Sequence, residues 1–385
     1  MPSKSRRRAE FFAASVLVAL AASTARAQDE TARVRAWTAA AANGDAMAAS
    51  SLGSAYENGR GVARDAAMAA LWYERAAAQG VAVAQHNLAS LYHLGDGVEQ
   101  DDVRAAALFR AAAVQGLVPA ERSLAFLLDA GAGVPQDVAE AVHWFQLAAD
   151  AGDAPAEDAL ASHYDHGSGV AADDAEALRW YRAAAEQGFA DAQMRLGEFF
   201  EAGRGVAADD AQAVVWFERA AAQDNAEALW RLGLHYQRGR GVAVDNARAL
   251  DCHRRSAALG FAPAENAVGV MYDEGLGVAH DAAEAVRWYT QAADRGFVVA
   301  EANLAEHLMN GDGIAQDDTE ALSLFERAAR QGDAPSAFFA GVFHAEGRGT
   351  VADAGAARRW FETAAASDDA EVRDAAKEWL AQLPP

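Results

Sequence analysis

The apolar positions of this chain recur with the spacing of amphipathic helices. In residues 45–80, Ala48, Leu52 and Tyr56 lie at i, i+4 and i+8 and therefore share one stripe of a helix. A second apolar stretch runs from Ala69 to Ala77 and has an aromatic pair near its centre. The pattern predicts two helices joined by a short loop.

The loop between these helices carries signals of its own. Gly59 stands where the first helix must end in the left-handed conformation, which glycine adopts without a steric penalty. Gly61 permits a second tight turn, and Asp65 is placed to cap the second helix with its side chain. In several copies a Glu or Gln follows this aspartate by three residues and predicts a reciprocal capping box: Glu140, Glu176, Gln212, Glu284 and Glu320.

This helix–turn–helix unit occurs nine times without insertion or deletion. The first loop glycine recurs at a constant step, 36 residues from each copy to the next, at Gly59, Gly95, Gly131, Gly167, Gly203, Gly239, Gly275, Gly311 and Gly347. The positions of Ala69 and Ala77 are occupied by alanine in every copy, so two helices can approach closely there. A fixed period of this kind is typical of stacked repeats, in which each unit buries its apolar face only against its neighbours. The sequence thus predicts an all-α solenoid of nine repeats.

The two ends of the chain fit the same scheme. Residues 28–44 are predicted to form an N-terminal capping helix, residues 45–368 the nine repeats, and residues 369–385 a C-terminal capping helix. Residues 1–27 have a basic start, a short apolar core and small residues at the predicted cleavage site, and are predicted to be a signal peptide. An uncleaved membrane anchor is the alternative, although the apolar core is short for a bilayer span. Cleavage would leave a periplasmic or secreted protein with no membrane insertion.

The composition limits the partners and the chemistry. The net charge of the whole chain is −23, and the part after residue 27 has 28 basic and 55 acidic residues, or −27. So acidic a surface repels nucleic acid and anionic lipid and favours basic partners. The single cysteine, Cys252, excludes an intramolecular disulfide and occupies an aromatic core position, which predicts a buried, inert thiol.

The variable positions of the first helices supply the candidate binding site. Packing does not require large apolar residues on the helix face opposite the Leu52 stripe, yet several copies place them there. Tryptophan and arginine are frequent anchors of protein interfaces, and Trp230 and Arg231 are adjacent. We therefore predict a binding patch that is formed by Phe126, Met194, Trp230, Arg231, Leu234, Val270 and Phe338. The alternative is that these side chains are buried inside a tightly curved solenoid.

Catalytic, metal and cofactor motifs are not predicted. Gly167-Ser168-Gly169 is the ordinary inter-helix loop rather than a nucleophile turn, because no strand precedes it. Paired aspartates such as Asp173-Asp174 place their first members at helix caps. His163 and His166 have only a weak metal spacing, and the histidines that share one repeat position, His163, His235 and His307, are two repeats apart. We expect no cofactor, no metal and no enzymatic activity.

Repeat six is irregular. Cys252-His253 replaces the aromatic pair, and Asp224 replaces the terminal glycine of the preceding copy. A hinge between two halves and local repacking are both compatible with this pattern.

The pattern A-x-x-x-L-G-x-x-Y-x-x-G-x-G-V-x-x-D-x-x-x-A-x-x-W-Y-x-x-A-A-x-x-G, read from Ala48 to Gly80, closely resembles the Sel-one-like repeat. The resemblance covers residues 45–368 and implies a right-handed superhelix of antiparallel helix pairs with a concave face lined by first helices. Members of that family act mostly as adaptors in protein complexes, and several exported bacterial members regulate envelope signalling or exopolysaccharide production. The cysteine-rich branch linked to β-lactam hydrolysis has paired cysteines that this chain lacks.

We therefore expect an exported scaffold that binds one or more envelope proteins or peptides through its first helices. Two alternatives remain open at this point. One is an envelope enzyme of the β-lactamase or peptidoglycan-active type, and the other is a peptidoglycan-binding module that uses Trp230 and its neighbours.

Overall fold

The computed structural model describes residues 28–384, which are helical with connecting loops and contain no strand. A helix of residues 28–42 comes first, and the predicted signal peptide lies outside the described residues. The helices that follow are α2 (Ala46–Asn58), α3 (Ala66–Ala77), α4 (Ala82–Leu94), α5 (Asp102–Ala113), α6 (Val118–Ala130), α7 (Val138–Asp150), α8 (Ala154–His166), α9 (Asp174–Glu186), α10 (Ala190–Ala202), α11 (Asp210–Ala221), α12 (Ala226–Arg238), α13 (Asn246–Ala258), α14 (Ala262–Glu274), α15 (Ala282–Asp294), α16 (Val298–Asn310), α17 (Asp318–Arg330), α18 (Ala334–Glu346), α19 (Ala354–Ala364) and α20 (Ala370–Gln382). The prediction of an all-α fold of paired helices is confirmed.

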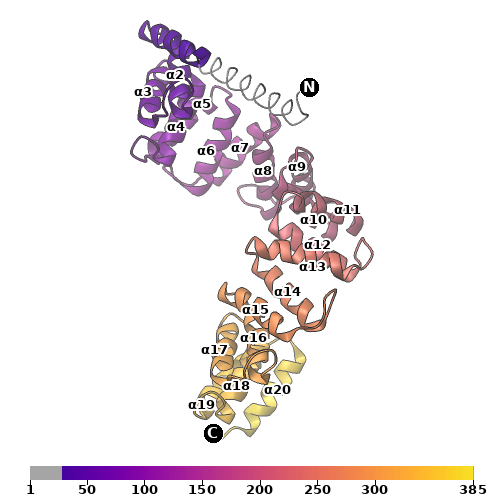
Figure 1. Cartoon of the computed structure of the whole chain (residues 1–385). Helices are drawn as coiled ribbons and strands as arrows, with labels where there is room; N and C mark the ends of the chain where they lie inside the picture. Colours follow the sequence, from indigo (N-terminus) through magenta and orange to yellow (C-terminus); the bar gives the residue numbers. More distant parts are fainter. Residues whose placement is uncertain (1–27, 385) are drawn as a thin grey trace, which may run out of the picture. The chain divides into compact units, whose positions relative to one another are not determined.

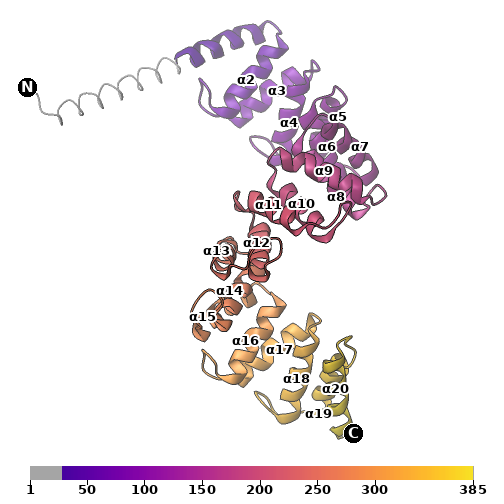
Figure 2. The same cartoon turned by 90° about the vertical axis from the view of Figure 1, so that its right-hand side faces the viewer.

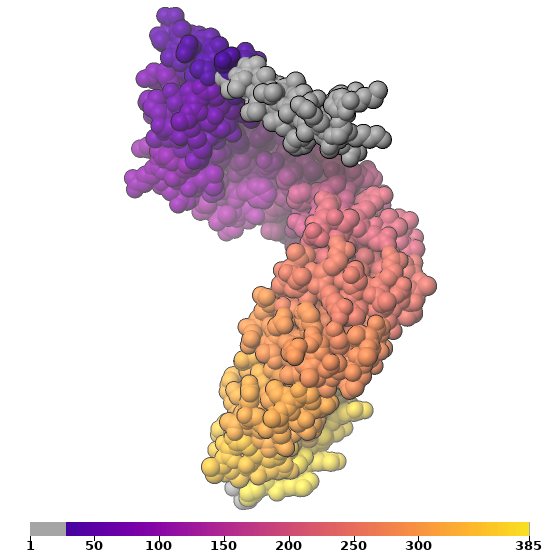
Figure 3. Space-filling model, viewed as in Figure 1, coloured from indigo at the N-terminus to yellow at the C-terminus, as the bar shows by residue number. Residues whose placement is uncertain are grey.

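Repeat one consists of α2 and α3, and the pairs continue in order to repeat nine, which consists of α18 and α19 (Figure 1). The chain divides into two compact units, the first ending at Gln187 and the second beginning at Gly188. Unit one holds repeats one to four, and unit two holds repeats five to nine and α20. Within each unit, helices that are consecutive in sequence pack side by side (Figure 2). The colours in Figure 3 accordingly run in sequence order along each unit without mixing.

The loop of each repeat has the backbone that its residues predict. Gly59 ends α2 in the left-handed conformation with φ of 65°, and its amide donates to the carbonyl of Ala55. Asp65 caps α3, and its side chain accepts a hydrogen bond of 3.0 Å from the amide of Met68. The same arrangement recurs in all nine repeats, so the capping role predicted for the first member of each aspartate pair is confirmed.

The predicted capping box is only half formed. The amide of Glu140 donates to the side chain of Asp137 at 2.9 Å, as expected. The amide of Asp137, however, donates to the carbonyl of Leu128 at 3.0 Å, which belongs to the preceding helix. The Glu140 carboxylate instead accepts a hydrogen bond from the indole of Trp144 and pairs with Arg110. The hydrogen bond from the Asp137 amide to the Leu128 carbonyl replaces the bond that the Glu140 side chain would make in a capping box, and it joins the two helices of the repeat.

The second loop glycine lets each repeat rest on the one before it. A Cβ atom on Gly313 would fall less than 3.0 Å from backbone atoms of Ala282 and Ala283, at the start of α15. The same close approach to the first turn of the preceding second helix occurs at Gly97, Gly133, Gly169, Gly241, Gly277 and Gly349. A side chain at this position would therefore push two repeats apart.

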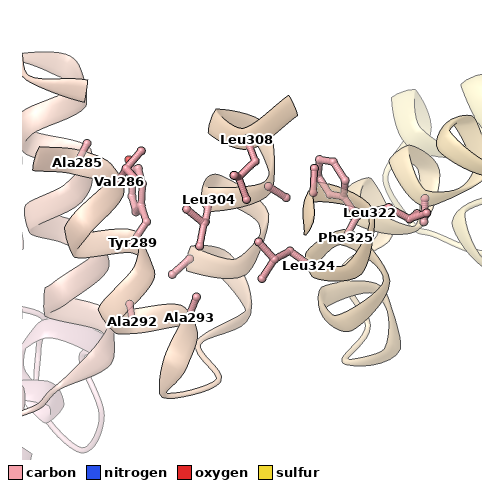
Figure 4. Packing of buried hydrophobic residues seen from close by; sticks show 14 of the residues in the cluster. Ala285, Val286, Tyr289, Ala292, Ala293, Leu304, Leu308, Leu322, Leu324 and Phe325 are labelled. Carbon is pink, nitrogen blue, oxygen red and sulfur yellow. The ribbon is translucent and has the colours of Figure 1, made fainter. Parts of the chain in front are cut away.

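The core lies between first and second helices and continues from repeat to repeat. Tyr289 of α15 points toward Leu304 and Leu308 of α16, and Phe325 of α17 packs on the other side of α16 (Figure 4). The alanines that flank each ring, such as Ala292, are buried and bring the helices close together. Burial of one such ring contributes about 2–3 kcal/mol.

Salt bridges add a second link between neighbouring repeats. The second members of two aspartate pairs bind the arginine in the Gly-x-Gly loop of the next repeat. Asp210 lies 2.8 Å from Arg240, and Asp318 lies 2.9 Å from Arg348. The hydrogen bond from Arg348 holds the pKa of Asp318 below its usual range. In these two pairs one carboxylate acts within its own helix and the other acts between repeats, whereas Asp102 contacts His93 of its own repeat at 2.7 Å.

The helices at the two ends use the same aromatic packing. In the helix of residues 28–42, Val34 is buried and packs with Leu52 and Ala55 of α2, and Trp37 lies against this cluster. At the other end, Trp379 of α20 stacks on Phe361 with ring centroids 5.4 Å apart.

Repeat six keeps the fold despite its altered residues. His253 takes the place of the buried aromatic ring, and its side chain packs directly against Gly233. Its Nε2 lies 3.2 Å from the amide oxygen of Gln237, whereas its Nδ1 has no hydrogen-bond partner among the described residues. Asp224 adopts the left-handed conformation of the glycine that it replaces, with φ of 57°. Local repacking accounts for these substitutions.

We predict that Gly313→Ala weakens the stack far more than Gly332→Ala. Both glycines have positive φ, so alanine costs about 1 kcal/mol at either position. Only Gly313 faces the backbone of the preceding repeat, whereas Gly332 has nothing within 4 Å. The free energy of unfolding, measured with urea, should fall by at least about 2 kcal/mol more in Gly313→Ala than in Gly332→Ala. Equal losses in the two variants would show that the close approach of the loop does not hold the repeats together.

We predict that His253 makes the protein acid-sensitive. Burial lowers the pKa of His253 from 6.5 to about 4. The unfolded chain therefore binds this proton at higher pH than the folded chain, so the stabilisation is complete above pH 6.5 and is lost as the pH falls toward 4. The free energy of unfolding is expected to fall by about 3 kcal/mol once the pH is below the folded-state pKa of His253.

The matched variant is His253→Phe, which restores the residue found at this position in repeats two, three, five, eight and nine. It should remove the unpaired buried nitrogen and flatten the dependence of the unfolding free energy on pH between 6.5 and 4. The measurement is urea unfolding at several pH values. If the unfolding free energy depended on pH equally in the wild type and in His253→Phe, His253 would not be the source of the acid sensitivity.

Candidate functional site

The first helices of unit two present one variable face. In α12 a partly exposed stripe of this face runs through Glu227, Arg231, Leu234 and Arg238, which are spaced i, i+4, i+7 and i+11; only Arg238 is fully exposed. Trp230 lies at the border of this stripe and is half-buried. The stripe lies on the side of α12 away from Leu232, which is buried against the second helices. Residues on it are free to vary between repeats because packing does not fix them.

Trp230 is held in place by aromatic contact. Its ring centroid lies 5.7 Å from that of Phe261, which comes just before α14, in a tilted arrangement. The guanidinium of Arg231 lies 5.7 Å from the centroid of the same indole. The indole therefore contacts both Phe261 and Arg231 while part of it remains exposed, which is the state of a preorganised anchor.

Arg231 is surrounded by carboxylates. Its guanidinium lies 2.9 Å from Glu227 on its own helix and 3.5 Å from Glu201 on α10, and it also pairs with Glu198. Glu201 is further bound by Arg240 at 2.9 Å. The pKa of Glu201 is lowered by the neighbouring His235 and further by the charges of Arg240 and Arg231. These contacts connect α10 and α12 by charge on the face that carries Trp230.

Leu234 and Val270 extend the apolar part of this face. Leu234 lies one turn after Trp230 on α12, and Val270 occupies the same repeat position on α14. Both side chains are half-buried, and Val270 packs against the apolar core cluster of repeats seven to nine. Trp230, Leu234 and Val270 thus form a partly exposed apolar strip beside the charges around Arg231. We call Trp230, Arg231, Leu234 and Val270 the α12–α14 patch.

Three other residues predicted for the patch lie in different surroundings. Met194 is only 4% exposed and belongs to the core. Phe338 is half-buried and packs on Phe361 and Phe339, with centroid distances of 5.7 Å and 5.8 Å. Trp230 and Phe338 occupy the same repeat position as Met194 and are half-buried, so the prediction that this position is exposed is wrong for Met194.

Phe126 belongs to unit one and has a separate setting. It is 46% exposed and makes an edge-on contact with Phe145 at 4.9 Å. The ring lines a shallow hollow of about 450 Å³ together with Asp129, His163 and His166, among others. The two histidines of the weak metal motif each direct Nδ1 to a backbone carbonyl, His163 to Ser168 and His166 to Ser162, both at 2.9 Å.

The sequence interpretation missed the carboxylates around Arg231. Glu198 and Glu201 precede Arg231 by 33 and 30 residues, which is three and six residues short of the 36-residue repeat. Comparison of each arginine with acidic residues of the preceding repeat would have found them. Comparing the residues that occupy one and the same position in successive repeats does not find these pairs, because the two partners occupy different positions in adjacent repeats.

The groups considered for catalysis from the sequence lie in the following surroundings. Cys252 is buried, and burial raises the pKa of its thiol to about 11, which leaves almost no thiolate at neutral pH. Ser168 lies in the loop that follows α8, and its carbonyl accepts the hydrogen bond from His163. No helix among residues 28–384 is both long and apolar enough to cross a bilayer.

Comparison with known proteins supports the repeat assignment along the chain. The family model described as Sel1 repeat matches nine segments: 46–81, 82–117, 118–153, 154–189, 190–225, 226–261, 262–297, 298–333 and 334–369. No curated protein matches the chain.

Two solved structures are similar to most of the chain. One is c5321, described as a protective antigen of uropathogenic Escherichia coli strains with an SLR fold; it shares 31% identity, covers 89% of this chain and 82% of that chain, and gives a TM-score of 0.66. The other is a Sel1 repeat protein from Oxalobacter formigenes, also with 31% identity, which covers 81% of this chain and 90% of that chain with a TM-score of 0.66. With nine matched repeats and these two similar structures, the chain belongs to the Sel1 repeat family.

Proposed function

We propose that the protein is an exported, non-catalytic scaffold that binds a protein or peptide of the bacterial envelope through the α12–α14 patch. The observation that carries the proposal is the position of Trp230, an indole held by Phe261 and Arg231 yet partly exposed on a face that packing leaves variable. Large rings in this state are the usual centres of protein interfaces. Among the tryptophans of the second helices, Trp144, Trp180 and Trp216 are buried, whereas Trp72, Trp288 and Trp360 are half-buried like Trp230; Trp230 differs from them in lying on a first helix.

The shape and charge of the patch define the partner. Trp230, Leu234 and Val270 offer an apolar strip, which suits a partner that presents an aliphatic or aromatic anchor. Arg231 is already paired with three glutamates, so it is not free to recruit an acidic partner. The acidic character of the chain instead favours a partner with basic residues around its apolar anchor. A role in envelope signalling or in exopolysaccharide production is the setting that we propose for such a complex.

Export rests on the sequence of residues 1–27. Their basic start, apolar core and small residues before Gln28 support secretion followed by cleavage. The description of the similar Escherichia coli protein as a protective antigen is compatible with a location outside the cytoplasm. We propose that binding takes place in the periplasm or beyond it.

We predict that Leu234→Ser lowers the affinity for the partner at least tenfold, because loss of a central apolar contact of this size costs about 1–3 kcal/mol. Trp230→Ala should have a larger effect. Val215→Ser is the matched control, since Val215 is a 39% exposed apolar residue on α11, a second helix. Circular dichroism and thermal unfolding should show that all three variants remain folded.

The partner is identified first by crosslinking in cells. A photoreactive residue at position 234 should capture one envelope protein that the same residue at position 215 does not capture. Titration of that protein against the wild type and the three variants then measures the affinities. Unchanged affinity in both Leu234→Ser and Trp230→Ala would exclude the patch. Saturable binding of muropeptides at position 234 with no captured protein would favour a peptidoglycan-binding module.

A further inference from the structure

Three histidines occupy the same position in repeats four, six and eight and make the same backbone contact. In each, Nδ1 lies within hydrogen-bond distance of the carbonyl oxygen at the centre of the following Gly-x-Gly loop: His163 to Ser168 at 2.9 Å, His235 to Arg240 at 2.8 Å, and His307 to Asp312 at 3.0 Å. Because a carbonyl can only accept a hydrogen bond, Nδ1 must carry the proton in all three rings. The other nitrogen, Nε2, is thereby left to face the neighbouring repeat.

Each Nε2 points toward a carboxylate of the preceding repeat. The distances are 3.8 Å from His163 to Asp129, 3.6 Å from His235 to Glu201, and 3.4 Å from His307 to Asp273. With its proton on Nδ1, a neutral ring turns the lone pair of Nε2 toward the lone pairs of a carboxylate. A divalent cation between the two groups would accept the lone pair of Nε2 and be held by the carboxylate as well.

The central residue of the loop differs among the three sites. In repeat six it is Arg240, whose guanidinium lies 2.9 Å from Glu201 and supplies positive charge from the chain itself. In repeat four it is Ser168, which carries no charge. In repeat eight it is Asp312, which adds a second carboxylate, and among residues 28–384 no arginine pairs with Asp273 or Asp312. The site in repeat eight therefore has an excess of negative charge where the site in repeat six has an internal cation.

The three groups of the site in repeat eight lie close together. The ligand atoms of Asp273, His307 and Asp312 are all within 4.8 Å of one another. His307 is only 8% exposed and Asp273 is half-buried, whereas Asp312 is exposed on the loop. Zinc–ligand bonds of about 2.0–2.2 Å require ligand atoms within about 4.4 Å of one another, so a small movement of the Asp312 side chain would be sufficient.

We propose that Asp273, His307 and Asp312 bind a divalent transition-metal ion, with Nε2 of His307 and one oxygen of each carboxylate as ligands. One imidazole and two carboxylates form a donor set that suits Zn²⁺, and water would complete the coordination. The bond from Nδ1 of His307 to the Asp312 carbonyl is the outer contact that orients metal-bound histidines in general. The ion would link α14, α16 and the loop after α16, and so tie repeat seven to repeat eight.

The sequence alone did not indicate this site. The three histidines were compared with one another along their shared position, where they are two repeats apart. The ligands of one ion come instead from adjacent repeats, with Asp273 placed 34 residues before His307. The proposal is independent of the α12–α14 patch, because none of the three ligands belongs to it.

The test is isothermal titration calorimetry of Zn²⁺ into the full chain without residues 1–27, after removal of metals and of any affinity tag. We expect one ion per chain. Asp312→Asn should lower the affinity at least tenfold, and Asp312→Arg, which copies the arrangement of repeat six, should abolish binding. Glu274→Gln is the matched control, since it removes one exposed carboxylate next to Asp273 and should leave the affinity unchanged.

A gain of binding provides a further check. Ser168→Asp should give repeat four the donor set of repeat eight and raise the stoichiometry from one ion to two. The proposal is overturned if the wild type shows no saturable binding up to about 1 mM Zn²⁺. It is equally overturned if Asp312→Arg binds as tightly as the wild type, because the metal would then lie elsewhere. Thermal unfolding with and without Zn²⁺ should show stabilisation of the wild type and none of Asp312→Arg.

Discussion

The stack depends on the close approach between a loop glycine and the backbone of the preceding repeat. At Gly313 and at the equivalent positions there is no room for a Cβ atom, because the first turn of the preceding second helix lies directly against the loop. This contact fixes both the distance and the register between repeats. An inserted residue in either helix would move the loop away from this turn, which explains why nine copies keep the same length. The aspartate cap and the left-handed glycine serve this contact, since they give the loop its shape.

The same constraint leaves one face of each first helix free. The buried positions of both helices are committed to packing, whereas the partly exposed stripe through Arg231 and Leu234 varies between repeats. The chain uses this freedom in two ways. It places charged residues that bind across repeats, as Arg231 does with Glu201, and it places apolar groups that remain partly exposed, as at Trp230. A rigid frame with a variable surface is well suited to binding, because little conformational entropy is lost when a partner docks.

The fold could be predicted from the sequence because its determinants are local and repeated. Gly59 and Asp65 act within a few residues of the chain, and nine copies make their meaning unambiguous. The site was predicted less well, because its geometry depends on contacts between repeats. Met194 was assigned to the exposed face, yet the packing of neighbouring helices buries it. Glu140 was expected to complete a capping box, but Trp144 and Arg110 compete for its carboxylate, and a backbone carbonyl takes the amide that the box would use.

The three histidine positions show how such a repeat changes its chemistry without changing its fold. Each ring is held by the same bond to the loop and faces a carboxylate at the same place in the preceding repeat. The residue between the two glycines differs in charge, being serine, arginine or aspartate, whereas the facing residue is always acidic. Because the glycines fix the backbone, this central residue can vary at little cost in stability while it sets the charge beside the histidine. Differences in binding between Sel1 repeats are therefore to be sought in this loop residue as well as on the exposed stripe of the first helices.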